Sequence, residues 1–243
     1  MHQKLTAVVW DFDGTLVDTR RKNMNVARAL VKHITGSDPD EFQALQDLAG
    51  YEPALHRHRH WRDFYRQELR MGETDIDRTE EHWLEFQIAD ETPAEIYDGI
   101  REVLETFAHL PQGIVSLNIR ANITRFLAQL EIDRHFGKVL GAEDVETGYQ
   151  KPHPHALVRC IEQLTCAAPG LVVYVGDHET DVECAHRAND HFQAAGTDIR
   201  VVSVGALYAP HLTDDHWDVE PDGKATAPRE ILSELTRIFA ALP

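Results

Sequence analysis

The chain has few cysteines, and their spacing argues against two common kinds of site. Only three of its 243 residues are cysteine, and no two of them form a Cys-x-x-Cys pair. Cys160, Cys166 and Cys184 thus resemble neither a disulfide framework nor a zinc site, although the chain has 15 histidines. We expect reduced thiols, solvated histidines and a cytoplasmic location.

Long hydrophobic runs and basic residues are also scarce. The N-terminal apolar run, Leu5–Trp10, is far too short for a signal peptide or a membrane span. Only 24 Lys and Arg residues oppose 41 Asp and Glu residues, so the formal net charge is −17. This charge repels nucleic acids and anionic membranes, which we exclude as partners. An anionic substrate needs a local cationic site, and both a monomer and a homodimer remain open.

The chain does contain a regular alternation of apolar runs with helical patterns. The predicted strands are Leu5–Trp10, Ile114–Leu117, Lys138–Leu140, Leu171–Val175 and Arg200–Val204. The predicted helices are Gly99–His109, Ala121–Glu131, Pro154–Leu164, Glu179–Ala188 and Pro228–Ala240. Such alternation is typical of an α/β fold, here a Rossmann-like, doubly wound parallel sheet with helices on both faces.

One region interrupts this alternation and predicts a second module. It shows no convincing strand, and its helical stretches are Arg20–His33, Pro39–Leu48, Pro53–Arg70 and Asp77–Ala89. The glycines expected to end these helices are Gly36, Gly50 and Gly72. We therefore predict an α/β core of residues 1–17 and 93–243, with a small all-helical module of residues 18–92 inserted after the first strand. No function is assigned to residues 208–223.

The most informative residues follow the first predicted strand. In extended chain, residues i and i+2 point to the same side, so Asp11 and Asp13 project together while Phe12 points away. Gly14 then allows a sharp turn. Open α/β sheets bind ligands at this end of their strands. Two carboxylates this close repel each other and favour a cation, and oxygen ligands suit Mg²⁺.

The segment from Asp11 to Thr15 resembles the first motif of the haloacid dehalogenase-like superfamily, and more narrowly its phosphoglycolate phosphatase-like branch. In that family the first Asp is the nucleophile, and the second is a general acid and then a base. The dehalogenase branch lacks the second Asp, so Asp13 argues against dehalogenation. The resemblance also implies that the helical insert is a cap domain. Taken alone, the motif could instead be a strand that ends in an Asp-rich turn.

Ser116 and Lys151 resemble the second and third motifs of the family. Ser116 closes a predicted strand, but Leu117 fills the next position, where the family usually has Asn or Gly, and Asn118 is displaced by one. Lys151 precedes Pro154, which suits the first turn of a helix. The resemblance implies that this Lys offsets the negative charge of the nucleophile and the phosphate. A turn serine and a solvated lysine are the structural alternatives.

A second acidic turn, Gly176 to Asp181, follows another buried run and resembles the family's fourth motif. The resemblance implies that Asp177 binds Mg²⁺ and that Asp181 supports the site. Asp181 could also complement a helix dipole. The expected metal residues are Asp11, Asp13, Asp177 and Asp181. The expected catalytic residues are Asp11, Asp13 and Lys151, and the expected substrate-binding residues are Thr15, Ser116, Leu117 and Lys151.

Together the motifs predict a Mg²⁺-dependent phosphatase that hydrolyses a small, anionic phosphate ester through an aspartyl-phosphate. A phosphomutase of the same superfamily and a non-catalytic phosphate-sensing module on the same fold are the alternatives. Four arginines in the insert also recur at helical spacing, next to apolar positions, and predict a basic helix face that either binds the non-reacting end of the substrate or is solvated and balances the acidic surplus. They are Arg59, Arg62, Arg66 and Arg70.

Overall fold

The computed structural model describes residues 4–210 and 212–241, which form two compact units. The first unit contains the chain up to Val17, together with Ile96–Ala209 and the residues from Trp217 onward. The second unit contains Asp18–Glu95 and a separate segment, Pro210–His216. This segment corrects the predicted division, because the sequence places residues 210–216 with the core.

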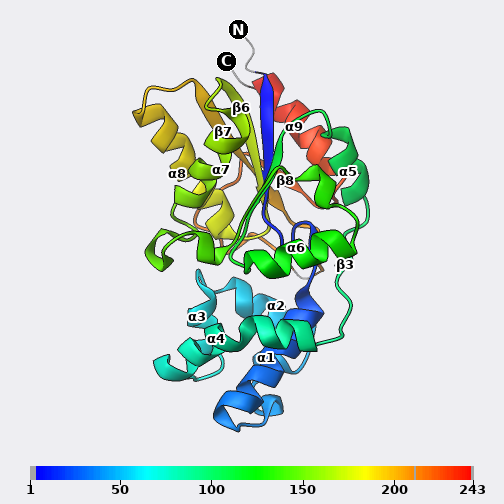
Figure 1. Ribbon diagram of the computed structural model, residues 1–243, viewed down its shortest axis with the longest axis vertical. Helices are drawn as coiled ribbons and strands as arrows, with labels where there is room; N and C mark the ends of the chain where they lie inside the picture. Colours follow the sequence, from blue (N-terminus) through cyan, green and yellow to red (C-terminus); the bar gives the residue numbers. More distant parts are fainter. Residues whose placement is uncertain (1–3, 211, 242–243) are drawn as a thin grey trace. The chain divides into compact units, whose positions relative to one another are not determined.

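A six-stranded parallel sheet forms the centre of the first unit (Figure 1). The strand order is β5-β4-β1-β6-β7-β8, with every neighbouring pair parallel. The strands are β1 (Leu5–Trp10), β4 (Gln112–Val115), β5 (Lys138–Leu140), β6 (Gly170–Gly176), β7 (Ile199–Ala206) and β8 (Gly223–Ala225). The predicted doubly wound α/β fold is therefore confirmed. The edge strand β8 is an addition that the sequence did not predict.

Helices cover both faces of this sheet. In Figure 1, α7 (His155–Thr165) and α8 (Glu179–Ala194) lie on one side, and α5 (Ile100–Thr106) and α9 (Glu230–Ala241) lie on the other. The remaining helix, α6 (Arg120–Gln129), follows β4. Only α8 departs strongly from its predicted bounds, since it was expected to end near Asn189. The Asn189 side chain accepts a hydrogen bond from the Val201 N–H instead (3.1 Å), and the helix continues to Ala194.

The central strands are buried on both faces, as parallel strands usually are. Ala7 and Val9 of β1 pack in one apolar cluster with residues of α7 and α8. Trp10 contacts Phe107, which follows α5, with ring centroids 6.4 Å apart, and its Nε1 donates to the Gln112 side chain (3.1 Å). Each fully buried apolar side chain of this kind contributes about 1.5–3 kcal/mol to folding. This packing fixes the end of β1, where the functional residues begin.

The second unit is helical, as predicted, but its elements differ from the predicted ones. Its helices are α1 (Arg20–Thr35), α2 (Leu48–His56), α3 (Trp61–Gln67) and α4 (Glu73–Ala89). Two 3-10 turns, Pro39–Glu41 and Gln43–Leu45, replace the helix predicted from Pro39 to Leu48. Two short strands, β2 (Val17–Asp18) and β3 (Glu95–Ile96), pair with each other where the chain passes between the units.

Two of the three expected glycine stops were wrong. Gly36 does end α1, in the left-handed region with a φ of 74°. Gly50 instead lies inside α2, where its N–H donates to the Asp47 carboxylate (2.8 Å) that caps the helix. Gly72 precedes α4 as its N-cap residue. Because Asp47 starts a helix that includes Pro53, the single helix predicted over 53–70 becomes α2 and α3.

The predicted basic face is also corrected, because α3 is too short to carry all four arginines. Arg59 and Arg70 lie outside it. Arg62 and Arg66 lie on it, but they form ion pairs with acidic side chains of α4. Arg62 pairs with Asp77, with Glu80 (3.0 Å) and with Glu73 (3.4 Å), and Arg66 pairs with Glu73 (2.6 Å). These guanidinium groups therefore join two helices of the second unit.

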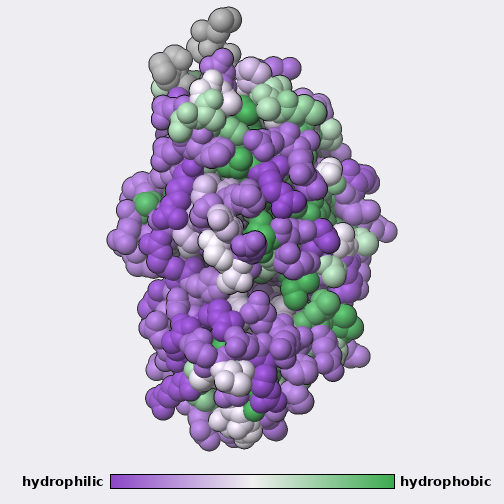
Figure 2. Space-filling model, turned by 60° about the vertical axis from the view of Figure 1, so that its left-hand side comes forward, coloured by the Kyte–Doolittle hydropathy of each residue, from purple (hydrophilic) through white to green (hydrophobic). Residues whose placement is uncertain are grey.

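Within the described ranges, no helix is long and apolar enough to cross a membrane. Hydrophilic residues cover most of the face seen in Figure 2, and hydrophobic residues appear there in smaller groups.

Candidate active site

The candidate site lies at the carboxyl ends of the central strands. The chain runs from β1 to β4 and β5 on one side, and then crosses to β6 on the other side of β1. Such a switch in direction leaves a crevice outside the strand ends, where open α/β sheets bind their ligands. The residues that follow β1, β4 and β6 are the acidic and polar groups singled out from the sequence.

A tight turn holds the first carboxylate, Asp11, in place. Its N–H donates to the Val175 carbonyl of β6 (2.8 Å), so the backbone stays in register just past the strand. Gly14 then takes a φ of 77°, and its N–H donates to the Val17 carbonyl (3.0 Å). A Cβ at Gly14 would overlap the Asp177 carboxylate. The turn therefore needs glycine for its conformation and for the close approach of Asp177.

Lys151 is a buried cation between two carboxylates. Its Nζ donates to Oδ1 of Asp11 (2.7 Å) and to Oδ1 of Asp181 (2.6 Å), and only 5% of the residue is exposed. Burial alone disfavours the charged ammonium, but Asp11 and Asp181 outweigh it and raise the pKa of Lys151. Lys151 is thus a fixed positive charge beside Asp11, the residue that the sequence suggested as the nucleophile.

The negative charge of the cluster exceeds this single cation. Carboxylate oxygens of Asp11, Asp177 and Asp181 lie within 4.8 Å of one another, and all three residues are buried. Burial raises the pKa of Asp11 to about 7, even though Lys151 opposes the shift. Burial, and then the charges of Asp11 and Asp181, raise the pKa of Asp177 well above its ordinary value. Three buried oxygen ligands of this kind fit Mg²⁺, whose charge would offset their repulsion.

Asp181 is held by neighbours on several sides. Its Oδ1 accepts hydrogen bonds from Lys151 and from the Tyr174 hydroxyl (2.9 Å), and its Oδ2 accepts from the His178 N–H (3.1 Å). The Tyr174 hydroxyl is also 3.0 Å from the Val115 carbonyl of β4. Asp181 therefore orients Lys151. Tyr174 was missed from the sequence, where only its position in an otherwise aliphatic strand signals a polar anchor.

The residues expected to bind substrate differ in their exposure. Ser116 is buried at the end of β4, and its Oγ accepts from the Asn118 N–H (3.3 Å). Leu117 is partly exposed beside it. Thr15 is fully buried, and its hydroxyl is 3.5 Å from Oδ1 of Asp177. The Thr15 side chain is therefore placed to support Asp177.

Two further residues of the site were not assigned a role from the sequence. The Tyr208 hydroxyl, from the previously unassigned segment, donates to the Thr15 carbonyl and so braces the turn after β1. Asn118, displaced by one from the family position, donates from Nδ2 to Oδ2 of Asp13 (2.8 Å). No local pattern in the sequence shows these contacts, because each joins residues more than 100 positions apart.

The chain is similar to known proteins over nearly its whole length. Pyrophosphatase PpaX of Bacillus cereus (strain Q1) is 26% identical over 240 residues, which cover 96% of this chain and 99% of the relative. A solved structure assigned as a phosphoglycolate phosphatase, from Lactobacillus plantarum, has a TM-score of 0.74 at 18% identity, with 95% of this chain and 99% of that one covered. A haloacid dehalogenase-like family hydrolase from Streptococcus pneumoniae has a TM-score of 0.67 at 19% identity, with 95% and 98% covered.

The family model that matches this chain covers the end of the first strand, the insert and most of the remaining core. It describes the haloacid dehalogenase-like hydrolases and matches residues 8–195. The matched segment includes Asp11, Lys151 and Asp177, which lie together in the buried cluster, and Ser116, which follows β4. The chain therefore belongs to the haloacid dehalogenase-like hydrolase family.

Proposed function

We propose that this protein is a Mg²⁺-dependent phosphatase that hydrolyses small phosphate esters through an aspartyl-phosphate on Asp11. The observation that carries the proposal is the buried cluster in which Lys151 bridges Asp11 and Asp181 while Asp177 lies alongside. One ammonium group cannot neutralise these carboxylates and a phosphate dianion together. Such a site favours a divalent cation and an anionic substrate that brings its phosphorus to Asp11.

In the first step the Asp11 carboxylate attacks phosphorus, and the bond from phosphorus to the ester oxygen breaks. Lys151 holds Asp11 through Oδ1 and favours its ionised form, which is the nucleophilic one. Asp13 gives its proton to the departing oxygen, so the alcohol leaves neutral. Ser116 and Lys151 are proposed to hold oxygens of the transferring phosphoryl group as its charge develops.

In the second step a water molecule attacks the phosphorus of the aspartyl-phosphate. Asp13, now ionised, takes a proton from this water, and the bond between phosphorus and Asp11 breaks to release inorganic phosphate. The carboxylates of Asp11 and Asp177 and the backbone carbonyl of Asp13 are the proposed Mg²⁺ ligands. Bound Mg²⁺ would supply neutralisation of phosphate charge in both steps.

The names of the relatives suggest which substrates to test first. The curated relative is a pyrophosphatase, and a structural neighbour is assigned as a phosphoglycolate phosphatase. Each name indicates an enzyme that acts on a small anionic compound carrying a phosphoryl group. We therefore propose inorganic pyrophosphate and small carboxylated phosphate esters as the first candidates, with 4-nitrophenyl phosphate as a generic reporter.

Steady-state hydrolysis of these compounds by the purified chain, with Mg²⁺ or with a chelator, tests the proposal. We expect turnover with Mg²⁺ and loss of turnover in chelator. Asp11→Asn should abolish activity, because an amide is not a nucleophile for phosphorus. An exposed acidic residue of the second unit, Glu81, supplies the matched control: Glu81→Gln should leave activity unchanged. Full turnover in chelator, or by Asp11→Asn, would overturn the proposal.

A further inference from the structure

Asn118 and Asp13 are joined by a hydrogen bond at the end of β4. The Asn118 side chain is buried, and its Nδ2 lies 2.8 Å from Oδ2 of Asp13. Its Oδ1 accepts from the Ile119 N–H at 2.8 Å. A backbone N–H can only donate, so the Ile119 contact fixes which side of the amide is oxygen. The amide group of Asn118 is therefore held with its donor side toward Asp13.

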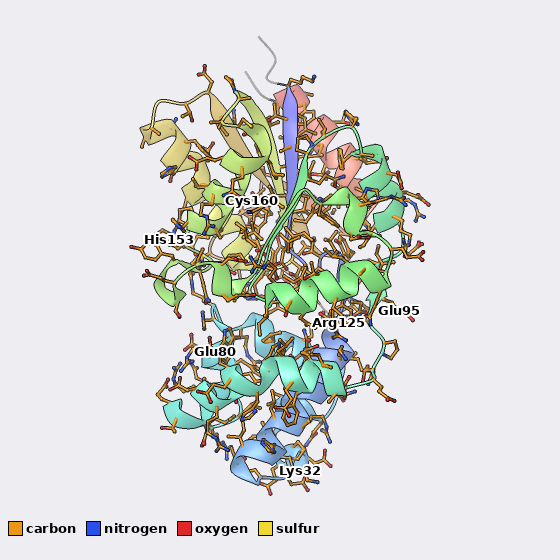
Figure 3. All side chains as sticks on the ribbon, in the orientation of Figure 1. Lys32, Glu80, Glu95, Arg125, His153 and Cys160 are labelled. Carbon is orange, nitrogen blue, oxygen red and sulfur yellow. The ribbon has the colours of Figure 1, made fainter. Side chains whose placement is uncertain are left out.

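A second amide reinforces this orientation. Nδ2 of Asn122, which is fully buried on α6, donates to Oδ1 of Asn118 (3.2 Å). Oδ1 of Asn122 in turn accepts from the Arg125 guanidinium (2.9 Å), which is always a donor. Arg125, labelled in Figure 3, extends from α6 and stacks over Phe126 at 4.7 Å from the ring centroid. In the series Arg125, Asn122, Asn118 and Asp13, each residue therefore donates a hydrogen bond to the next.

We infer that Asn118 is a positioning residue for the proton transfers of Asp13. This inference rests on the proposed function, in which Asp13 is the general acid and base. Oδ2 of Asp13 accepts from the amide of Asn118, and this bond holds the carboxyl group against rotation. A misplacement of about 1 Å in a catalytic group can cost as much as 10²-fold in rate.

Two substrates with different leaving groups separate positioning from a structural role. Phenyl phosphate releases a basic oxygen that needs a proton, whereas 4-nitrophenyl phosphate releases a stable anion. We expect Asn118→Ala to lower kcat/KM for phenyl phosphate about 10-fold to 10²-fold, with a much smaller loss for 4-nitrophenyl phosphate. In an Asp13→Ala background, Asn118→Ala should cause no further loss, because the group that it positions is already gone.

A second variant keeps the acceptor bond of Asn118, removes its donor and adds a negative charge beside Asp13. Asn118→Asp can still accept from the Ile119 N–H, but its carboxylate cannot donate to Asp13. It should lose activity on phenyl phosphate at least as severely as Asn118→Ala, with thermal unfolding measured alongside to confirm folding. Asn189→Asp is the matched control, since Asn189 also accepts a backbone N–H (3.1 Å) but lies outside this series. It should keep wild-type kcat/KM.

Three results would overturn the inference, and a fourth would contradict the proposed function on which it rests. Normal turnover of phenyl phosphate by Asn118→Asp would overturn the inference, because the acceptor bonds alone would then suffice. Equal losses on both substrates, or a further loss in the Asp13→Ala background, would overturn it as well. A wild-type enzyme that hydrolyses neither ester in Mg²⁺ would contradict the proposed function itself. Wild-type turnover is therefore measured before any variant is compared.

Discussion

At the scale of single residues, Asp11 has two conflicting requirements. It must be ionised to attack phosphorus, yet its burial raises its pKa from 3.8 to about 7 in the metal-free protein. Between these values the folded state binds more protons than the unfolded chain. The free energy of unfolding of the metal-free protein therefore falls, through this group, as the pH rises from about 4 to about 7. A bound cation would favour the ionised carboxylate and remove this loss.

This linkage predicts how Mg²⁺ changes stability. The increase in melting temperature on adding Mg²⁺ should be small near pH 5 and distinctly larger near pH 8, because protons compete with the cation at the lower pH. Differential scanning calorimetry with and without Mg²⁺ at both pH values measures it. Asp177→Asn, which removes a proposed ligand, should show a smaller increase at both. An equal increase for the wild-type protein at the two pH values would contradict the prediction.

At the scale of elements, the turn after β1 depends on one glycine. Gly14→Ala would strain a positive φ, which costs about 1–2 kcal/mol, and its Cβ would overlap the Asp177 carboxylate. We expect weaker Mg²⁺ binding in calorimetry and a fall in kcat/KM of about 10-fold or more. Gly36 is the matched control, because it has a similar φ of +74° but no atom near its Cβ position. Gly36→Ala should lose stability alone, and equal activity losses in the two variants would refute the proposed close approach.

In the second unit, a substitution on α3 should affect stability but not catalysis, in contrast to Gly14→Ala. Arg62 pairs with three acidic side chains of α4, which neutralise it. Arg62→Ala should lower stability by about 1 kcal/mol, because such pairs near the surface contribute little individually. It should leave KM nearly unchanged for both an acidic phosphate ester and 4-nitrophenyl phosphate. A KM that rises for the acidic ester alone would restore the substrate-binding role that the spacing of the arginines first suggested.

Elements with strong local signals were predicted well. The bounds of β1 and β5 agree with the sequence, because an apolar run bounded by polar or turn residues limits a strand from both sides. The bounds of α2, α3 and α8 were wrong where a cap or a tertiary contact outweighed the local pattern, as the bond from the Val201 N–H to Asn189 does. The strand β8 has only three residues, and it is defined by its pairing with β7 rather than by hydrophobicity.

At the scale of the whole molecule, the sequence could predict which strand ends meet but not every contact between them. Asp11 and Asp177 do come together, since parallel strands end at one edge of the sheet, and Lys151 reaches Asp11 from the loop before α7. The contacts of Tyr174 and Asn118 join residues far apart in the chain, and no local periodicity encodes the side-chain directions on which they depend.

The most direct test is to identify the residue that carries the phosphoryl group during turnover. The Asp13→Asn variant should still form the aspartyl-phosphate from 4-nitrophenyl phosphate, but it should hydrolyse this intermediate slowly because the base is missing. We expect acid quenching and mass spectrometry of its peptides to find phosphate on the peptide that contains Asp11, and to find none in the Asp11→Asn variant. Phosphate on a different residue, or release of 4-nitrophenol with no phosphorylated peptide, would contradict Asp11 as the nucleophile.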